Sequence, residues 1–104
     1  RHELMDRLNL DDDNTARLQL LGRCFNIDTQ QFSDLFTHYR TALDQARQTR
    51  LARRKQQLAE DRQINGTAVI VNLAADADWA QEADQLKAEY GQRLDALKQK
   101  IAEA

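Results

Sequence analysis

Three groups of side chains are of types that could support metal binding or acid–base catalysis. Asp34 and His38 are four residues apart, a spacing that brings two side chains to one face of a helix. Aspartates fill positions 11–13, and Asp76 is followed closely by Asp78. A metal site needs three or four converging ligands, and a catalytic pair needs a pocket that shifts its pKa values. The sequence indicates neither arrangement, so we expect no metal, no cofactor and no catalytic residue.

These side chains have simpler structural roles. We expect Asp76 or Asp78 to cap a helix, the run 11–13 to form a solvated turn, and His38 to be a surface or packing residue. Cys24 lies on the apolar side of a short predicted helix, which indicates a buried structural thiol. The chain has one cysteine, so no internal disulfide can form, and a lone thiol favours a reducing compartment such as the cytoplasm. An enzyme is the least supported class of function.

A cluster of basic residues forms the strongest local charge in the sequence. Its members are Arg47, Arg50, Arg53, Arg54 and Lys55. On a helix these side chains could contact the phosphates of nucleic acid. The cluster lacks interleaved aromatic residues for base stacking, and the net charge of the chain is −2, so a general polyanion binder is not expected. Because residues 40–62 are net basic and residues 76–104 net acidic, we expect the cluster to face the acidic helix.

The composition predicts an all-α fold with a thin core. Proline is absent and glycine occurs three times, while residues with high helix propensity make up much of the chain. Apolar residues account for 41% of the chain but aromatic residues for only 6%, which favours helices packed side by side over a thick globular core. A length of 104 residues fits one domain.

Helix start and stop signals divide this domain into four parts. They are a head of two short helices (1–28), a long helix (29–63), an uncharged tip (64–75) and a C-terminal long helix (76–104). Asn14 or Thr15 can cap the second short helix. Asp28 and Gln31 have the spacing of a capping box, and neither proline nor glycine interrupts the long helix that follows.

Apolar residues in the C-terminal segment follow coiled-coil spacing. They are Trp79, Ala83, Leu86, Tyr90, Leu94, Leu97 and Ile101. Their intervals are three or four residues, which predicts a helix with a continuous apolar stripe. The long helix before the tip has a similar stripe that weakens between Arg47 and Gln57. We expect the two helices to pack as an antiparallel, coiled-coil-like hairpin.

The tip is unusual because residues 63–75 carry no charge. Asn65-Gly66 is typical of a tight turn, and residues 67–71 are rich in β-branched side chains that suit strands. We expect a short strand or an extended loop here, with a helix from Ala68 onward as the alternative. Apolar side chains in such a segment should be covered by other protein.

A straight helix over 29–63 would place the tip about 50 Å from the head, at about 1.5 Å per residue. The chain could not then cover its own tip, so a second copy or a different protein would have to do so. Alternatively, the long helix breaks between Arg47 and Gln57 and folds back, which would allow a monomer. The chain begins at Arg1 rather than methionine, which suggests a trimmed chain or a fragment.

These features favour a non-enzymatic protein–protein interaction or assembly module, such as an adaptor or chaperone, that acts as a helical homodimer and binds a protein partner. The expected dimer surface comprises Val69, Ile70, Val71, Leu73 and Trp79. The alternative is a small nucleic-acid-associated regulator that uses the cluster from Arg47 to Lys55. An enzyme would need a pocket across a dimer interface, built from residues such as Asp34, His38 and Tyr39. No membrane-spanning run and no hydrophobic signal region occur in the sequence.

Overall fold

The computed structural model describes residues 3–62 and 70–103, which form helices and the segments that join them. The elements are α1 (Glu3–Asp6), α2 (Thr15–Cys24), α3 (Gln30–Arg62), the 3₁₀ helix η1 (Leu73–Ala75) and α4 (Ala77–Glu103). Within these two ranges no residue is in a strand. The predicted all-α class is confirmed, with two short helices ahead of two long ones.

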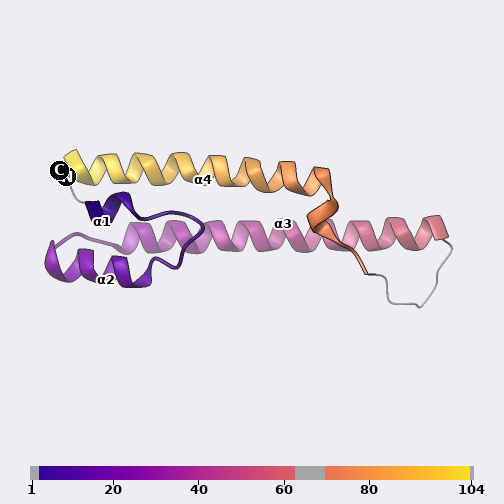
Figure 1. Ribbon diagram of the computed structural model, residues 1–104, viewed down its shortest axis with the longest axis horizontal. Helices are drawn as coiled ribbons and strands as arrows, with labels where there is room; N and C mark the ends of the chain where they lie inside the picture. Colours follow the sequence, from indigo (N-terminus) through magenta and orange to yellow (C-terminus); the bar gives the residue numbers. More distant parts are fainter. Residues whose placement is uncertain (1–2, 63–69, 104) are drawn as a thin grey trace.

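The two long helices determine the shape of the molecule. α3 and α4 pack side by side and run in opposite directions, and α1 and α2 pack where α3 begins and α4 ends (Figure 1). We call this end of the molecule the head. The last turns of α3 extend past the start of α4 at the other end (Figure 1). The result is an elongated molecule of 60 × 20 × 17 Å.

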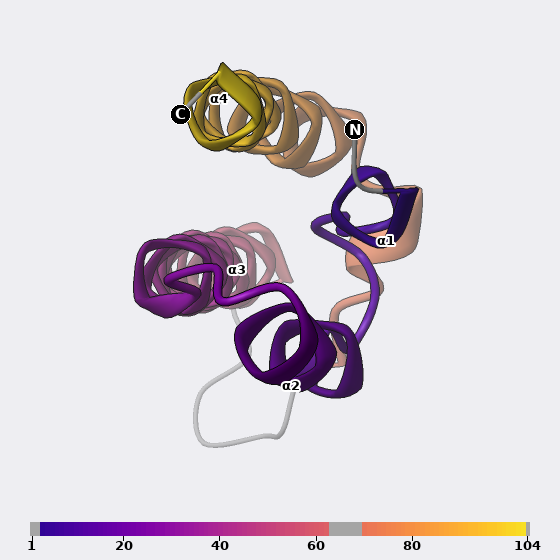
Figure 2. The same cartoon turned by 90° about the vertical axis from the view of Figure 1, so that its left-hand side faces the viewer.

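The hydrophobic core lies in the head, where four helices surround it (Figure 2). Its buried members are Met5, Leu8, Leu21, Phe32, Phe36 and Leu94. Phe32 and Leu21 have no exposed surface, and complete burial of one such side chain contributes about 1.5–3 kcal/mol to folding. The head therefore supplies most of the apolar packing that holds α1 and α2 against the long helices.

α3 is a single helix of 33 residues. The carboxylate of Asp28 accepts a hydrogen bond from the amide of Gln30 at 3.0 Å, and the carbonyl of Thr29 accepts one from the amide of Ser33 at 3.0 Å. These bonds satisfy backbone groups at the helix start, which was predicted near Asp28, but the observed bond is to the amide of Gln30, whereas a capping box pairs Asp28 with Gln31. The helix continues through residues 47–57, so the alternative in which it breaks there is wrong.

α4 begins at the predicted cap. Oδ1 of Asp76 accepts a hydrogen bond from the amide of Trp79 at 3.0 Å, while Asp78 lies in the first turn. All of the stripe residues from Trp79 to Ile101 are buried or half-buried, as predicted. Gly91 does not interrupt the helix. A Cβ atom at Gly91 would lie 4.0 Å from Cδ1 of Leu10, an ordinary contact distance, so α4 does not need glycine at this point.

The end of α2 differs from the sequence-based expectation. Cys24 is exposed, although its position after Leu21 predicted a buried thiol. α2 ends at Cys24, and the next residue, Phe25, has 49% of its surface exposed. Asn26 then adopts a left-handed backbone (φ 52°), and the chain turns away from the helix. Because the helix stops here, its buried face ends at Leu21.

The start of α2 is not capped by the side chain of Asn14. Asn14 occupies the capping position, but its side chain makes no hydrogen bond to α2; the carboxylate of Asp13 instead accepts one from the amide of Thr15 at 3.0 Å.

Of the predicted tip, residues 64–69 lie outside the described residues. The remainder contains a 3₁₀ turn, η1, capped by Asn72, whose side chain accepts a hydrogen bond from the amide of Ala74.

Removal of the buried ring of Phe32 tests the position of the core. We expect Phe32→Ala to lower the free energy of unfolding by about 3–5 kcal/mol, because it leaves a cavity between α3 and the other head helices. The control is Leu20→Ala, since Leu20 is also a large apolar residue in a helix but is 49% exposed. The control should change stability by less than about 1 kcal/mol. Urea unfolding followed by circular dichroism measures both values, and equal effects would contradict a core centred on Phe32.

Candidate interaction surface

A group of apolar residues lies at the start of α4, beside the projecting part of α3. We call Ile70, Val71, Leu73 and Trp79 the distal patch. Ile70 is 93% exposed, whereas Leu73 is 9% exposed, and Val71 and Trp79 are half-buried. Four of the five residues predicted to form a dimer surface thus lie close together along the chain. The fifth, Val69, lies outside the described residues.

Two backbone hydrogen bonds fix the turn that contains Leu73 of the distal patch. The amides of Ala75 and Asp76 donate to the carbonyls of Asn72 and Leu73 at 3.3 and 3.0 Å, and these bonds close the 3₁₀ turn. The turn directs the side chain of Leu73 to the interior while Ile70 faces solvent. The turn leads directly into Asp76, the cap of α4.

The basic cluster on α3 divides into paired and solvent-facing members. Nη2 of Arg50 lies 3.3 Å from Oε2 of Glu82, and Nε of Arg54 lies 3.5 Å from Oδ2 of Asp76. These two arginines face α4, as the opposite charges of the two segments predicted. Arg47 pairs within α3 with Asp44 at 3.9 Å. The two remaining members, Arg53 and Lys55, are exposed.

A shallow groove connects the basic cluster with the start of α4. Its lining includes Arg50, Arg53, Arg54 and Gln57 on α3 and residues 75–78 before and within the first turn of α4. Asp76 and Asp78 contribute carboxylates to the same groove, so its charge is mixed. A polyanion would have to compete with these carboxylates for the arginines. Contact with nucleic acid through this cluster stays a prediction.

The residues that suggested acid–base or metal chemistry are separated from one another. Asp34 accepts a hydrogen bond from the side chain of Gln30 at 2.8 Å, and both Asp34 and His38 are exposed on α3. Cys24 is exposed at the end of α2. Within residues 3–62 and 70–103, no three histidine, cysteine or acidic side chains are grouped closely enough to hold a metal ion.

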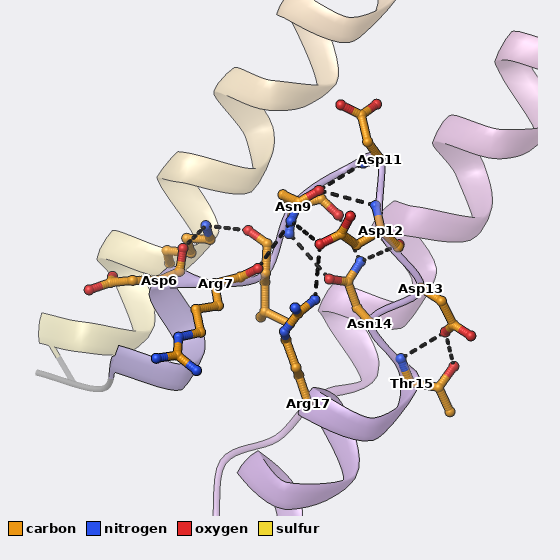
Figure 3. Close-up of polar contacts among 11 residues, drawn as sticks. Asp6, Arg7, Asn9, Asp11, Asp12, Asp13, Asn14, Thr15 and Arg17 are labelled. Carbon is orange, nitrogen blue, oxygen red and sulfur yellow. Dashed lines mark hydrogen bonds and ion pairs between the residues drawn. The ribbon is translucent and has the colours of Figure 1, made fainter.

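The acidic run between α1 and α2 belongs to a network of hydrogen bonds (Figure 3). Asn14 is 4% exposed, and its side chain accepts from the amide of Asn9 at 3.2 Å and donates to the carbonyl of Asn9 at 2.8 Å. The side chain of Asn9 in turn accepts from the amides of Asp11 and Asp12, both at 3.1 Å. Two asparagines thus fix the course of residues 9–14.

Sequence reasoning did not identify these asparagines as structural residues. Asn14 was expected only as a helix cap, and a buried amide in a loop has no periodic pattern that would reveal it. A weak signal was present, since Asn9 and Asn14 enclose the acidic run, and asparagine side chains often bond to nearby backbone groups in turns.

The same network changes the pKa values of its charged groups. A hydrogen bond from the side chain of Asn9 lowers the pKa of the Asp12 carboxyl, and Arg17, 3.2 Å away, adds to this effect. The pKa of Asp13 is lowered by its hydrogen bonds with the hydroxyl and amide of Thr15. These carboxylates therefore serve to order the loop.

An ion pair joins this loop to α4. Nζ of Lys87 lies 2.6 Å from Oδ2 of Asp11, and this bond raises the pKa of the lysine. Burial raises the pKa of the Tyr39 hydroxyl, with Asp11 adding to the effect. The ring of Tyr39 also packs against that of Tyr90, with 5.4 Å between the ring centres. The loop is thus tied to the middle of the α3–α4 pair.

Comparison with known proteins adds no functional assignment. The chain matches no known protein family, no curated protein and no solved structure. In the described part of the chain, none of the helices combines the length and the apolar character required to cross a membrane. The case for a function therefore rests on the geometry of the chain itself.

The hydrogen bonds of the loop predict which substitution changes the pKa of each aspartate. Removal of the Asn9 amide in Asn9→Ala should raise the pKa of Asp12 toward its ordinary value, because the largest stabilising contact of the carboxylate is lost. Asp13 is an internal control, since Thr15 holds its carboxylate. NMR titration of the two carboxyl groups measures both pKa values.

The lowered pKa of Asp12 makes the stability of the fold depend on acid pH in one direction. In the native chain the folded pKa of Asp12 is lowered, so its contribution to stability is present above the ordinary pKa and is lost as pH falls through the lowered value. Asn9→Ala should reduce this dependence on acid pH. An unchanged Asp12 titration would show that Asn9 does not set the pKa of this group.

Proposed function

We propose that the chain is a non-enzymatic interaction or assembly module that forms a homodimer through the distal patch. One observation carries the proposal. Ile70 exposes 93% of its surface next to Leu73, which is 9% exposed, in a segment without charged residues. Large aliphatic side chains exposed in an uncharged segment are typical of surfaces that another protein covers.

The shape of the single chain supports an assembly. Its radius of gyration is 18.7 Å, compared with about 13 Å for a compact domain of this length. Its accessible surface is 7560 Å², whereas a compact protein of this mass exposes about 6,000 Å². The excess, roughly 1,600 Å², is larger than the contribution of about 800 Å² per partner in a standard interface. The chain thus has ample surface available for a second copy.

The groups around the distal patch suit such an interface. In this proposal the α3–α4 pair is a hairpin whose end presents the patch, and an extended tip would add to it. Arg54 and Asp76 form a charged pair beside the patch, and stable interfaces commonly combine an apolar centre with a polar rim. A two-fold axis near Ile70 would bring two patches together, because like surfaces meet in a symmetric dimer.

The non-enzymatic character of the proposal rests on the arrangement of the reactive groups. Asp34 and His38 project from exposed positions on α3, and Cys24 is exposed on α2. Tyr39, by contrast, is 5% exposed and packs against Tyr90. A catalytic pair requires a desolvated pocket that tunes its protonation. Binding of protein surfaces needs no such pocket and accords with an elongated molecule of 60 × 20 × 17 Å.

An acidic substitution in the distal patch tests the proposal. We expect Ile70→Asp to convert the homodimer into a monomer, because the interface would then bury an unpaired carboxylate. The helical signal should remain, since Ile70 is exposed in the single chain. Light scattering across a concentration series measures the mass, and far-ultraviolet circular dichroism measures the helix content.

A matched control separates the effect of charge from that of position. Ala88→Asp adds the same charge at an exposed position on α4 and should leave the dimer intact. A monomeric native chain at concentrations up to about 100 μM, a weak affinity for a specific dimer, would refute the homodimer. A native dimer that Ile70→Asp leaves unchanged would refute the distal patch as its interface.

A further inference from the structure

The contact between α3 and α4 changes from apolar to polar along its length. Next to the head, the ring of Tyr39 of α3 packs at a tilt of 51° against that of Tyr90 of α4, with their ring centres 5.4 Å apart. Farther along α3 the residues that face α4 include Arg50 and Arg54, which are half-buried. Seven of the eight buried apolar residues in the described part of the chain belong to the head or to the Tyr39 contact, and the eighth is Leu73. The large apolar residues on the distal half of the helix pair, among them Leu51, Trp79 and Leu86, are only half-buried, apart from Leu73.

Two ion pairs connect the helices in this distal half. Arg50 and Glu82 have 22% and 40% of their side-chain surfaces exposed, and their charged atoms are 3.3 Å apart. Arg54 and Asp76 are 3.5 Å apart, with 41% and 12% exposed. Asp76 also caps α4, because its other carboxylate oxygen accepts a hydrogen bond from the amide of Trp79. Loss of the Arg54 contact therefore weakens the start of α4 as well as its attachment to α3.

The second half of α4 is attached to the head in several ways. Lys87 pairs with Asp11 at 2.6 Å, and Nζ of Lys98 donates to the carbonyl of Leu8 at 2.6 Å and to that of Asp6 at 3.3 Å. The side chain of Leu94 is 4% exposed within the head core. From Lys87 onward, α4 is therefore held by both apolar packing and polar contacts to a separate part of the chain.

We propose that residues 73–86, which we call the distal arm, form an electrolyte-sensitive clasp that separates from α3 while the head stays folded. Salt ions screen the partly exposed ion pairs that hold the arm. The buried core around Leu94 is not screened, so the arm opens before the head. This local equilibrium goes beyond the homodimer and does not depend on it.

Opening of the arm changes the surface that the molecule presents. The side chains of Leu73 and Trp79, which are buried and half-buried in the closed form, become more accessible. Arg50 and Arg54 of α3 lose their carboxylate partners at the same time. The open form thus offers a basic, partly apolar face on α3 that the closed form covers, and salt shifts the balance between the two forms.

Hydrogen exchange of the native chain tests the clasp directly. Raising NaCl from about 20 mM to about 500 mM should accelerate exchange of the amides of residues 80–86 by roughly threefold, the scale expected when two such pairs are screened. The amides of residues 90–99, in the anchored half of the same helix, should change little. An equal response in both halves of α4 would overturn the proposal.

Substitution of both arginines provides a second test. In Arg50→Gln/Arg54→Gln, residues 80–86 should exchange faster at low salt and should lose their salt response, because no bridging charge remains to be screened. The control is Arg47→Gln, since Arg47 pairs within α3 at 3.9 Å and does not bridge the helices. It should retain the native salt response. A double variant that responds to salt as the native chain does would also overturn the clasp.

Trp79 offers an independent readout because it is the one tryptophan of the chain and lies half-buried in the distal arm. On heating at high salt, the change in Trp79 fluorescence should occur at a lower temperature than the main loss of helical circular dichroism. The two transitions should therefore not coincide. The comparison uses the native chain and does not require a variant to fold. Coincident transitions at both low and high salt would contradict an independently opening arm.

Discussion

The packing of α3 against α4 is the interaction on which the other features of the molecule depend. A helix of 33 residues is about 50 Å long, and large buried apolar residues occupy only part of its contact with α4. Phe32 and Phe36 are buried near its start, where α1 and α2 complete the core. Farther along, the apolar side chains such as Leu51 are only half-buried, and Arg50 and Arg54 form ion pairs across to α4. A stable head and a weakly held distal end follow from this one distribution of side chains.

The main helices could be predicted from the sequence because their signals are local. The long helix expected at 29–63 is found at Gln30–Arg62, since Asp28 marks its start and no helix breaker lies within it. Asp76 or Asp78 was predicted to cap α4 from local signals of the same kind, and Asp76 is the one whose carboxylate accepts from the amide of Trp79. The apolar stripe of α4 gave its buried face correctly.

Features that depend on contacts between separate parts of the chain were not predictable. Lys98 bonds to carbonyl groups at the end of α1, some ninety residues earlier in the sequence, and Asn14 is buried through its bonds to Asn9. Neither contact leaves a periodic pattern. Cys24 was expected to be buried because the helical period was extended beyond Leu21, but the helix ends before another turn could form. The pairing of Arg50 with Glu82 was foreseen only as opposite charge between two segments.

The two proposals for the distal end are linked through residues that they share. Leu73 and Trp79 belong to both the distal patch and the distal arm, and Asp76 lies between them. If a second copy binds the patch in its closed arrangement, dimerisation stabilises the closed arm by the ratio of its affinities for the closed and open forms. Linkage then requires that a condition that opens the arm weakens the dimer in proportion to the closed fraction that is lost. A salt-dependent dimer whose interface contains Ile70 is therefore explained by the ion pairs of Arg50 and Arg54, even though neither arginine needs to contact the second copy.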